Sequence, residues 1–301
     1  MPGRSSEDFK DIQKQFVEPL AGLIEELGLS PDEVGYYLLA KHAPERNAVI
    51  AQKAAEHRAK LVAQAEKQNN QTALKRYEEN PAPFQNYETE KGGSGISNQE
   101  AQRILDGAEA DGNTAKLEES VAIIYKMLQY QRDKMVSSGL LDEESRADWE
   151  DTYQFYVPLK GFAAEEGSDF SDYSTGSKTS GFSIKGSESL KALGRTTLPL
   201  NPVYTSIIDV ETKAVRGRKN EIANKLLEML RTVGNTDQWT IWTNKKRPTA
   251  KFDPARMMDM REMDTATRKD GQTPRFIRVK KGGQTFWIEF DSDTLNAELH
   301  K

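Results

Sequence analysis

The chain contains no cysteine, which excludes disulfide bonds and metal sites built on thiolates. Its histidines (His42, His57 and His300) do not recur at the spacing of metal ligands. No run of about 18 apolar residues is present, so the sequence predicts no membrane-spanning helix and no membrane partner. A Gly-x-Ser-x-Gly nucleophile motif is also missing. These absences predict a chain with no catalytic residues, no metal and no cofactor.

Hydrophobic residues make up only 36% of the 301 positions, and charged residues make up 30%. That length allows one large domain or two of ordinary size, with long stretches of solvated surface. The N-terminus lacks the apolar stretch of a signal peptide, and the lack of cysteine fits a reducing cytoplasm. The sequence stops where a new polar helix begins, so we expect a longer protein to continue beyond Lys301.

Charge is distributed unevenly along the chain, whose net charge is −5. Residues 1–150 hold 18 Lys and Arg against 27 Asp and Glu, a net of −9. Residues 213–281 hold 18 basic and 8 acidic residues, a net of +10. This basic segment permits an anionic partner, although a solvated surface of mixed charge gives the same pattern.

The first half of the sequence predicts an irregular helical bundle. Apolar residues recur at helical spacing over 7–27 and, most clearly, over 114–138, where Gly139 closes the helix. Ser30 and Ser97 each begin a helix with Glu three residues later, which is typical of a capping box. Residues 45–79 are polar and Ala-rich and predict a long polar helix.

Two prolines predict interruptions. Pro19 should kink the first helix or divide it in two, and the helix that begins after Ser30 should break before Pro44. Residues 80–95 are rich in Pro and Gly and indicate a flexible linker. Gly92-Gly93-Ser94-Gly95 does not qualify as a phosphate-binding loop, because no strand precedes it and no Gly-Lys-Ser/Thr follows.

The second half mixes strands with one long helix. Residues 153–159 indicate a strand or extended segment, 160–187 a recognition loop, a lid or disorder, 202–232 a helix, and 237–243 a strand. Apolar residues around Gly282-Gly283 predict a β-hairpin, with Phe286, Ile288 and Phe290 on one face. Trp287 and Glu289 lie on the other face, where Trp287 covers a second layer, an interface or a hydrophobic patch.

We therefore expect an α+β fold, mainly α: an irregular helical bundle followed by a mixed part with a long helix and a small antiparallel sheet. The predicted segments are a helical segment (1–80), a linker (81–96), a helical bundle segment (97–150), and an α+β segment (151–301) with its 160–187 loop and 274–290 hairpin.

One candidate site is the motif Lys41-His42-Ala43-Pro44-Glu45-Arg46-Asn47. In a catalytic interpretation, His42 is a general base, and Glu45 and Arg46 bind an anion. In a structural interpretation, which we prefer, Pro44 ends one helix, Glu45 begins the next at the favourable end of its dipole, and Arg46 reaches a buried acid or carbonyl. His42, Pro44, Glu45 and Arg46 then form a structural corner.

A second candidate is a nucleic-acid interface. Its phosphate contacts would come from Lys213, Arg216, Arg218 and Lys219, extended by Lys245, Lys246 and Arg247. Trp239 and Trp242 lie nearby in the sequence and could stack on bases. The alternative is an exposed helix face paired with acids, with Gly217 allowing close helix packing or a bend.

Several short motifs, taken in order, resemble the large polyvalent proteins of phages, prophages and mobile elements. They extend over residues 15–292: Phe16-Val17-Glu18-Pro19-Leu20, the Lys41–Asn47 motif, Gly92-Gly93-Ser94-Gly95-Ile96-Ser97, Tyr156-Val157-Pro158-Leu159, Gly181-Phe182-Ser183-Ile184-Lys185-Gly186, Arg216-Gly217-Arg218-Lys219-Asn220, Trp239 and the Gly282-Gly283 hairpin.

The resemblance implies a module of a much longer protein, located in the virion interior or the host bacterial cytoplasm. It carries no assigned catalytic residues. Our first hypothesis is a non-catalytic structural and interaction module, whose partners are other domains of the same chain or a host or virion protein. It would support genome entry or counter host defence. The alternatives are a DNA- or RNA-binding module that uses residues 213–281, and an enzyme with its site near the 160–187 loop.

Overall fold

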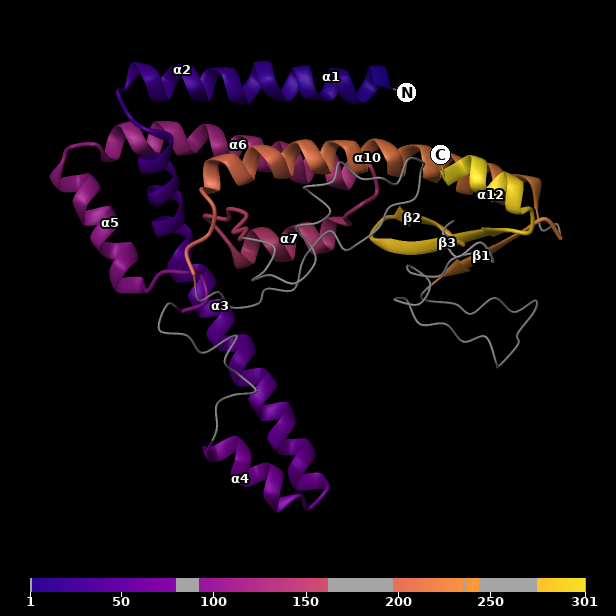
Figure 1. Cartoon of the computed structure of the whole chain (residues 1–301), viewed down its shortest axis with the longest axis horizontal. Helices are drawn as coiled ribbons and strands as arrows, with labels where there is room; N and C mark the ends of the chain where they lie inside the picture. Colours follow the sequence, from indigo (N-terminus) through magenta and orange to yellow (C-terminus); the bar gives the residue numbers. More distant parts are fainter. Residues whose placement is uncertain (1, 80–91, 162–196, 235–236, 244–274, 301) are drawn as a thin grey trace.

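The computed structural model describes residues 2–79, 92–161, 197–234, 237–243 and 275–300. These residues form a mainly helical α+β fold with one three-stranded antiparallel sheet, which confirms the predicted fold class. Long helices lie side by side in the body of the molecule, and the sheet lies at one end of this layer (Figure 1). The helices are α1 (Pro2–Ile12), the π-helix η1 (Gln13–Val17), α2 (Glu18–Glu26), α3 (Pro31–Lys67), α4 (Gln71–Glu79), α5 (Asn98–Ala110), α6 (Thr114–Ser137), α7 (Glu143–Thr152), α10 (Pro202–Val233) and α12 (Asp293–His300).

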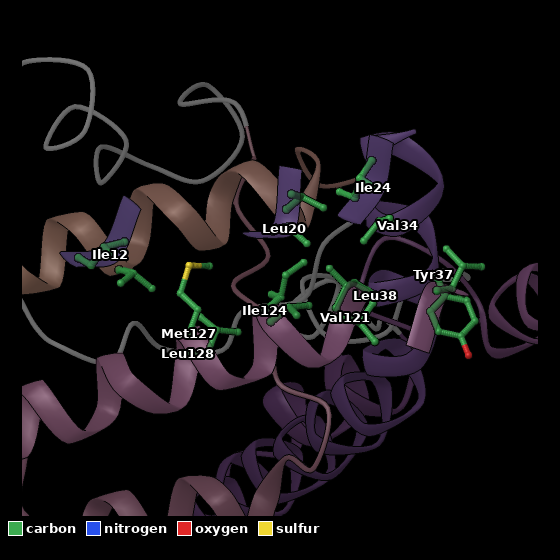
Figure 2. Packing of buried hydrophobic residues seen from close by; sticks show 14 of the residues in the cluster. Ile12, Leu20, Ile24, Val34, Tyr37, Leu38, Val121, Ile124, Met127 and Leu128 are labelled. Atoms are coloured by element: carbon green, nitrogen blue, oxygen red, sulfur yellow. The ribbon is translucent and has the colours of Figure 1, made fainter. Parts of the chain in front are cut away.

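The main core joins helices that are far apart in the sequence. Apolar side chains of α1 and α2 meet those of α3, α6 and α10 in one buried cluster (Figure 2). Ile12, Leu38 and Ile124 are fully buried there, and Val210 belongs to the same cluster. Burying such side chains contributes about 1.5–3 kcal/mol each, so this cluster is a main source of stability. It contains residues from three of the four predicted segments, 1–80, 97–150 and 151–301.

The helical backbone runs unbroken from Pro2 to Glu26, so the N-terminal helix is not divided in two at Pro19. The chain passes through the five-residue π-helix η1 immediately before it, and Pro19 occupies the first turn of α2. Within η1, the N–H of Glu18 donates to the carbonyl of Gln13, five residues earlier. The proline cannot donate an α-helical hydrogen bond, and this wider turn accommodates the missing donor.

The predicted break at Pro44 is wrong. Helix α3 is 37 residues long, from Pro31 to Lys67, and continues without a break through Pro44. Its N-cap is Ser30, which forms the predicted capping box with Glu33. An internal proline costs about 3 kcal/mol, because it removes a hydrogen bond and crowds the preceding turn. Pro44 faces solvent, and its neighbours in the helix make long-range contacts, described below, that offset this cost.

Beyond Lys67 the expected single polar helix divides in two. Asn69 adopts a left-handed φ of 52°, the N–H of Asn70 donates to the carbonyl of Ala65, and the Asn70 side chain accepts from the N–H of Ala73. These bonds end α3 and cap the N-terminus of α4. The result is a helical hairpin that extends away from the body (Figure 1). We call residues 51–79 the arm.

The sheet has the strand order β1-β3-β2, where β1 is Trp239–Thr243, β2 is Ile277–Lys281 and β3 is Gln284–Phe290. Gly282 and Gly283 both have positive φ, which confirms the predicted hairpin turn. One face of the sheet, which includes Ile288, packs against Leu227 of α10. On the other face Trp287 is only 1% exposed, so it is not the uncovered residue that an interface or an exposed patch requires.

Residues 153–159 form no strand; they continue as an extended segment from the end of α7. The hydroxyl of Thr205 donates to the carbonyl of Pro158, and the N–H of Leu200 donates to the carbonyl of Lys160. The segment is therefore held against the beginning of α10. Residues 162–187 of the predicted loop, with its Gly181–Gly186 motif, lie outside the described residues.

Candidate functional site

The Lys41–Asn47 motif lies on one continuous helix and contacts several distant segments. The ammonium group of Lys41 lies 2.7 Å from a carboxylate oxygen of Glu118 on α6, and the hydroxyl of Tyr37 donates to the same oxygen at 2.6 Å. The Lys41 ammonium also lies 4.4 Å from the ring centroid of Phe155. This residue therefore joins α3 to α6 and to the extended segment through an ion pair and a cation–π contact.

His42 is enclosed by aromatic rings. It is 1% exposed, and its ring centroid lies 5.2 Å from that of Tyr153 and 5.7 Å from that of Tyr156. Its Nδ1 lies 3.8 Å from the Glu45 carboxylate, which is beyond hydrogen-bond distance. Burial lowers the pKa of His42, against the opposing effect of Glu45, so the imidazole is neutral at pH 7. A buried ring without access to solvent does not fit a general base.

Glu45 fixes the extended segment to α3. Its two carboxylate oxygens accept hydrogen bonds, each 3.0 Å long, from the backbone N–H groups of Gln154 and Phe155. Burial alone would raise the pKa of Glu45, but the charge and hydrogen bonds of its neighbours hold the pKa below its usual value. Arg46 is half-buried beside this contact. The motif is thus a structural contact region, but not the helix corner that Pro44 predicted.

Asn47 holds the segment that leads into α5. Its side-chain oxygen accepts from the N–H of Ser94 at 2.9 Å, and its amide nitrogen donates to the carbonyl of Ile96 and the side chain of Asn98. We call this group of contacts the Asn47 clamp. Residues 93–96 are buried, so the expectation of a flexible linker is wrong for them, and residues 80–91 lie outside the described residues.

Glycine is required in this segment by close contact with α3. Gly93 has a φ of 94°, and a Cβ added there would lie 2.8 Å from the side chain of Ile50. A Cβ at Gly92 would lie 2.3 Å from the Asn47 side chain. The chain therefore leaves the body along α3 at Ile50 and returns at Gly92 beside the same turn. The described segments before the arm and after residue 91 therefore lie side by side.

Arg218, the central residue of the basic motif on α10, forms ion pairs within the protein. The guanidinium of Arg218 donates to both carboxylate oxygens of Asp8 on α1, at 2.6 and 2.8 Å, and to Glu221 at 3.0 Å. Asp8 is buried, and these hydrogen bonds raise the pKa of Arg218 above its usual value. A bidentate pair with a buried acid is one of the stronger charge-assisted contacts. Arg218 therefore does not present its charge to a nucleic acid.

The other members of the predicted interface give it no further support. Lys213, Arg216 and Lys219 are all half-buried. Burial, followed by the charge of Arg216, lowers the pKa of Lys219. Lys245, Lys246 and Arg247 lie outside the described residues. The described part of this segment thus supports the structural interpretation of the motif.

Asn220, the last residue of the basic motif, resembles Asn47 in its role. Its side-chain oxygen accepts from the N–H of Lys280 at 2.8 Å, and its amide nitrogen donates to the carbonyls of Lys280 and Ser138. We call these contacts the Asn220 clamp. It completes the outer edge of strand β2 and joins the sheet to the end of α6. A Cβ on Gly217 would lie 3.1 Å from the Ser138 hydroxyl, so glycine allows the close helix packing that was predicted as one alternative.

A buried polar group around Asp209 was missed by the sequence analysis. The Lys160 ammonium lies 3.0 Å from one Asp209 oxygen, and the Gln131 amide donates to the other oxygen at 2.7 Å. In the sequence, Asp209 lies among apolar residues that recur at helical spacing in α10. This position could have predicted that the Asp209 carboxylate is buried. Both carboxylate oxygens are engaged, so the group stabilises the fold and does not present a free base.

Two further classes of site are absent from the residues that the structure describes. They contain no cluster of three or more His, Cys, Asp or Glu residues that could hold a metal ion. No helix among them is long and apolar enough to cross a membrane. Comparison of the chain with protein-family models, curated proteins and solved structures gave no match.

The arm contributes no residue to the four apolar clusters of the described chain. Among its described side chains only Ala54 and Ala65 are buried, and both are small. The outer part of α3, residues 51–67, extends for about 25 Å at 1.5 Å per residue. A long, solvated helical hairpin that the body does not need for its packing is available for contacts with another molecule.

Proposed function

We propose that this chain is a non-catalytic structural and interaction module of a large phage or prophage polyvalent protein. The ordered motifs support the kind of protein. The geometry of those motifs supports the non-catalytic role, because their charged and polar side chains are used in contacts between distant segments. The protein would be carried in the virion or act in the host cytoplasm, supporting genome entry or countering host defence.

The structure of the arm is the main support for the proposal. The described chain that follows it resumes at Gly92 and Gly93, beside Asn47 and Ile50 at the base of the arm, and the arm contributes no residue to the apolar clusters. Surface insertions with these properties are tolerated by the fold and commonly carry binding functions. The body is therefore the scaffold, and the arm is the surface that contacts a partner.

A deletion in the full-length protein tests this division. Residues 52–91 would be replaced by a short Gly-Ser linker in the phage or prophage that encodes the protein. We expect normal protein levels but a loss of infectivity or of protection from host defence. The matched variant is His42→Phe, which changes the enclosed ring and leaves the arm intact. Normal function without the arm, or loss of function in a folded His42→Phe protein, would contradict the proposal.

A further inference from the structure

Three lysines form a straight line along the exposed side of the arm. Lys53, Lys60 and Lys67 recur at intervals of seven residues on α3, and all three are exposed. Seven residues are close to two helical turns, so the three side chains share one face, about 10.5 Å apart. His57 and Gln64 occupy the same face between them and are also exposed. We call the three lysines the lysine stripe.

The lysine stripe differs from the main cations of the body in its pairing. Arg218, Lys160 and Lys41 each lie within 3.0 Å of a carboxylate oxygen. None of the three stripe lysines forms an ion pair with a described residue. Desolvation is the main cause that lowers the pKa of Lys53, the charge of Arg46 adds to it, and Glu56 acts in the opposite direction.

The composition of this face selects the class of partner. Apart from alanine, no apolar side chain lies on it, and Glu56 at its edge already accepts a hydrogen bond from Gln52 at 2.9 Å. The centres of protein–protein interfaces are apolar and depleted in lysine. Interfaces with DNA are more polar and strongly positive, and lysine contacts to phosphates need no apolar centre. The face therefore fits a phosphate backbone better than an acidic protein surface.

We propose that the lysine stripe binds the phosphate backbone of duplex DNA without reading its sequence. The distance from Lys53 to Lys67 along the helix is about 21 Å, which corresponds to roughly six base pairs. This inference rests on the proposed role of the arm as the contact surface and adds the class of partner. It assigns nucleic-acid contact to residues other than the basic segment 213–281.

Fluorescence anisotropy with a labelled 20-base-pair duplex of arbitrary sequence tests the inference on the whole chain. We expect binding at low salt, with log affinity falling against log salt at a slope of about −2.7 for three phosphate contacts. The variant Lys53→Glu/Lys60→Glu/Lys67→Glu should bind at least about 10-fold more weakly. Since these side chains are exposed, circular dichroism should show an unchanged helix content.

The control is Lys10→Glu/Lys14→Glu/Lys126→Glu, which makes the same change in net charge at exposed lysines of the body. We expect this control to keep its affinity within about twofold. An equal loss in both variants, no binding by the unmodified chain, or stripe-dependent binding of polyglutamate in preference to DNA would each overturn the inference. If the arm is essential for infection but the stripe variant binds DNA normally, only this inference fails. If the stripe binds DNA but the arm is dispensable for infection, only the proposed function fails.

Discussion

In the body of the molecule, Arg218 and Lys160 lie against carboxylates of buried aspartates, whereas the lysine stripe of the arm forms no ion pair with a described residue. The body also buries two asparagines, Asn47 and Asn220, whose side chains replace missing backbone partners. Unusual sequence motifs therefore mark internal contacts in this chain. The surface that we propose for contact with a partner lies in a polar region that carries no distinctive motif.

The largest expected effect is at the Asn220 clamp. Asn220→Ala removes hydrogen bonds to both backbone groups of Lys280 and to Ser138, in a fully buried position. We expect the free energy of unfolding to fall by about 3 kcal/mol, because buried polar groups lose their partners. Urea denaturation measures this change. On the arm, the exposed Gln64→Ala should change the free energy of unfolding by less than about 0.5 kcal/mol. Similar losses in the two variants would remove the contrast between body and arm.

A smaller loss is expected where the chain returns to the body. Gly93→Ala places a Cβ against Ile50 at a φ of 94°. We expect thermal and urea denaturation to show a loss of about 2 kcal/mol. The matched control is Gly107→Ala on α5, where an added Cβ meets nothing within 4 Å. This control should raise stability by up to about 1 kcal/mol, because alanine favours helix. A Gly93→Ala protein as stable as the unmodified chain would show that the segment is not tightly packed on α3.

The pH dependence of stability tests the burial of His42. Burial lowers the pKa of His42 in the folded protein, so the unfolded chain binds a proton that the folded chain does not. The contribution of neutral His42 is complete above the unfolded pKa of about 6.5 and is lost as the pH falls below it. We expect a loss of up to about 1.4 kcal/mol per pH unit below that value.

Urea denaturation at pH 7.5, 6.5 and 5.5 would measure this slope. His42→Phe should give a shallower slope over the acid part of the range, whatever its effect on stability at pH 7.5. The lowered pKa of Glu45 adds a loss in the same direction below the ordinary glutamate pKa of 4.5, outside the measured range; because His42 contributes to this lowering, the loss differs between the two proteins. Equal slopes in the two proteins would contradict the enclosed, neutral state of His42.

Local rules predicted the parts of the fold that depend on neighbouring residues. The capping boxes at Ser30 and Ser97 and the Gly282-Gly283 turn follow from short-range sequence patterns. Pro44 was predicted wrongly because its local cost is offset by Lys41, Glu45 and Asn47, whose partners lie 47–110 residues away. Such pairings are not visible in a single sequence.

At residues 153–159, where a strand or an extended segment was predicted, the structure shows the extended segment, and the reason is again a long-range contact. Aromatic and β-branched residues favour a strand, but a strand needs a neighbour with which to pair. Here the Glu45 side chain accepts from the backbone N–H groups of Gln154 and Phe155 instead. The seven-residue spacing of the lysine stripe is visible in the sequence. Its lack of ion pairs is not, because pairing depends on where carboxylates from distant segments lie in the folded chain.

Removal of the arm tests the central division between scaffold and contact surface most directly. A chain in which a Gly-Ser-Gly linker replaces residues 52–91 would be compared with the unmodified chain by thermal unfolding followed by circular dichroism. Since the arm buries only Ala54 and Ala65 among its described side chains, we expect a single cooperative transition within a few degrees of the original midpoint. A chain that failed to fold, or whose midpoint fell by about 10 °C or more, would show that the arm is part of the scaffold.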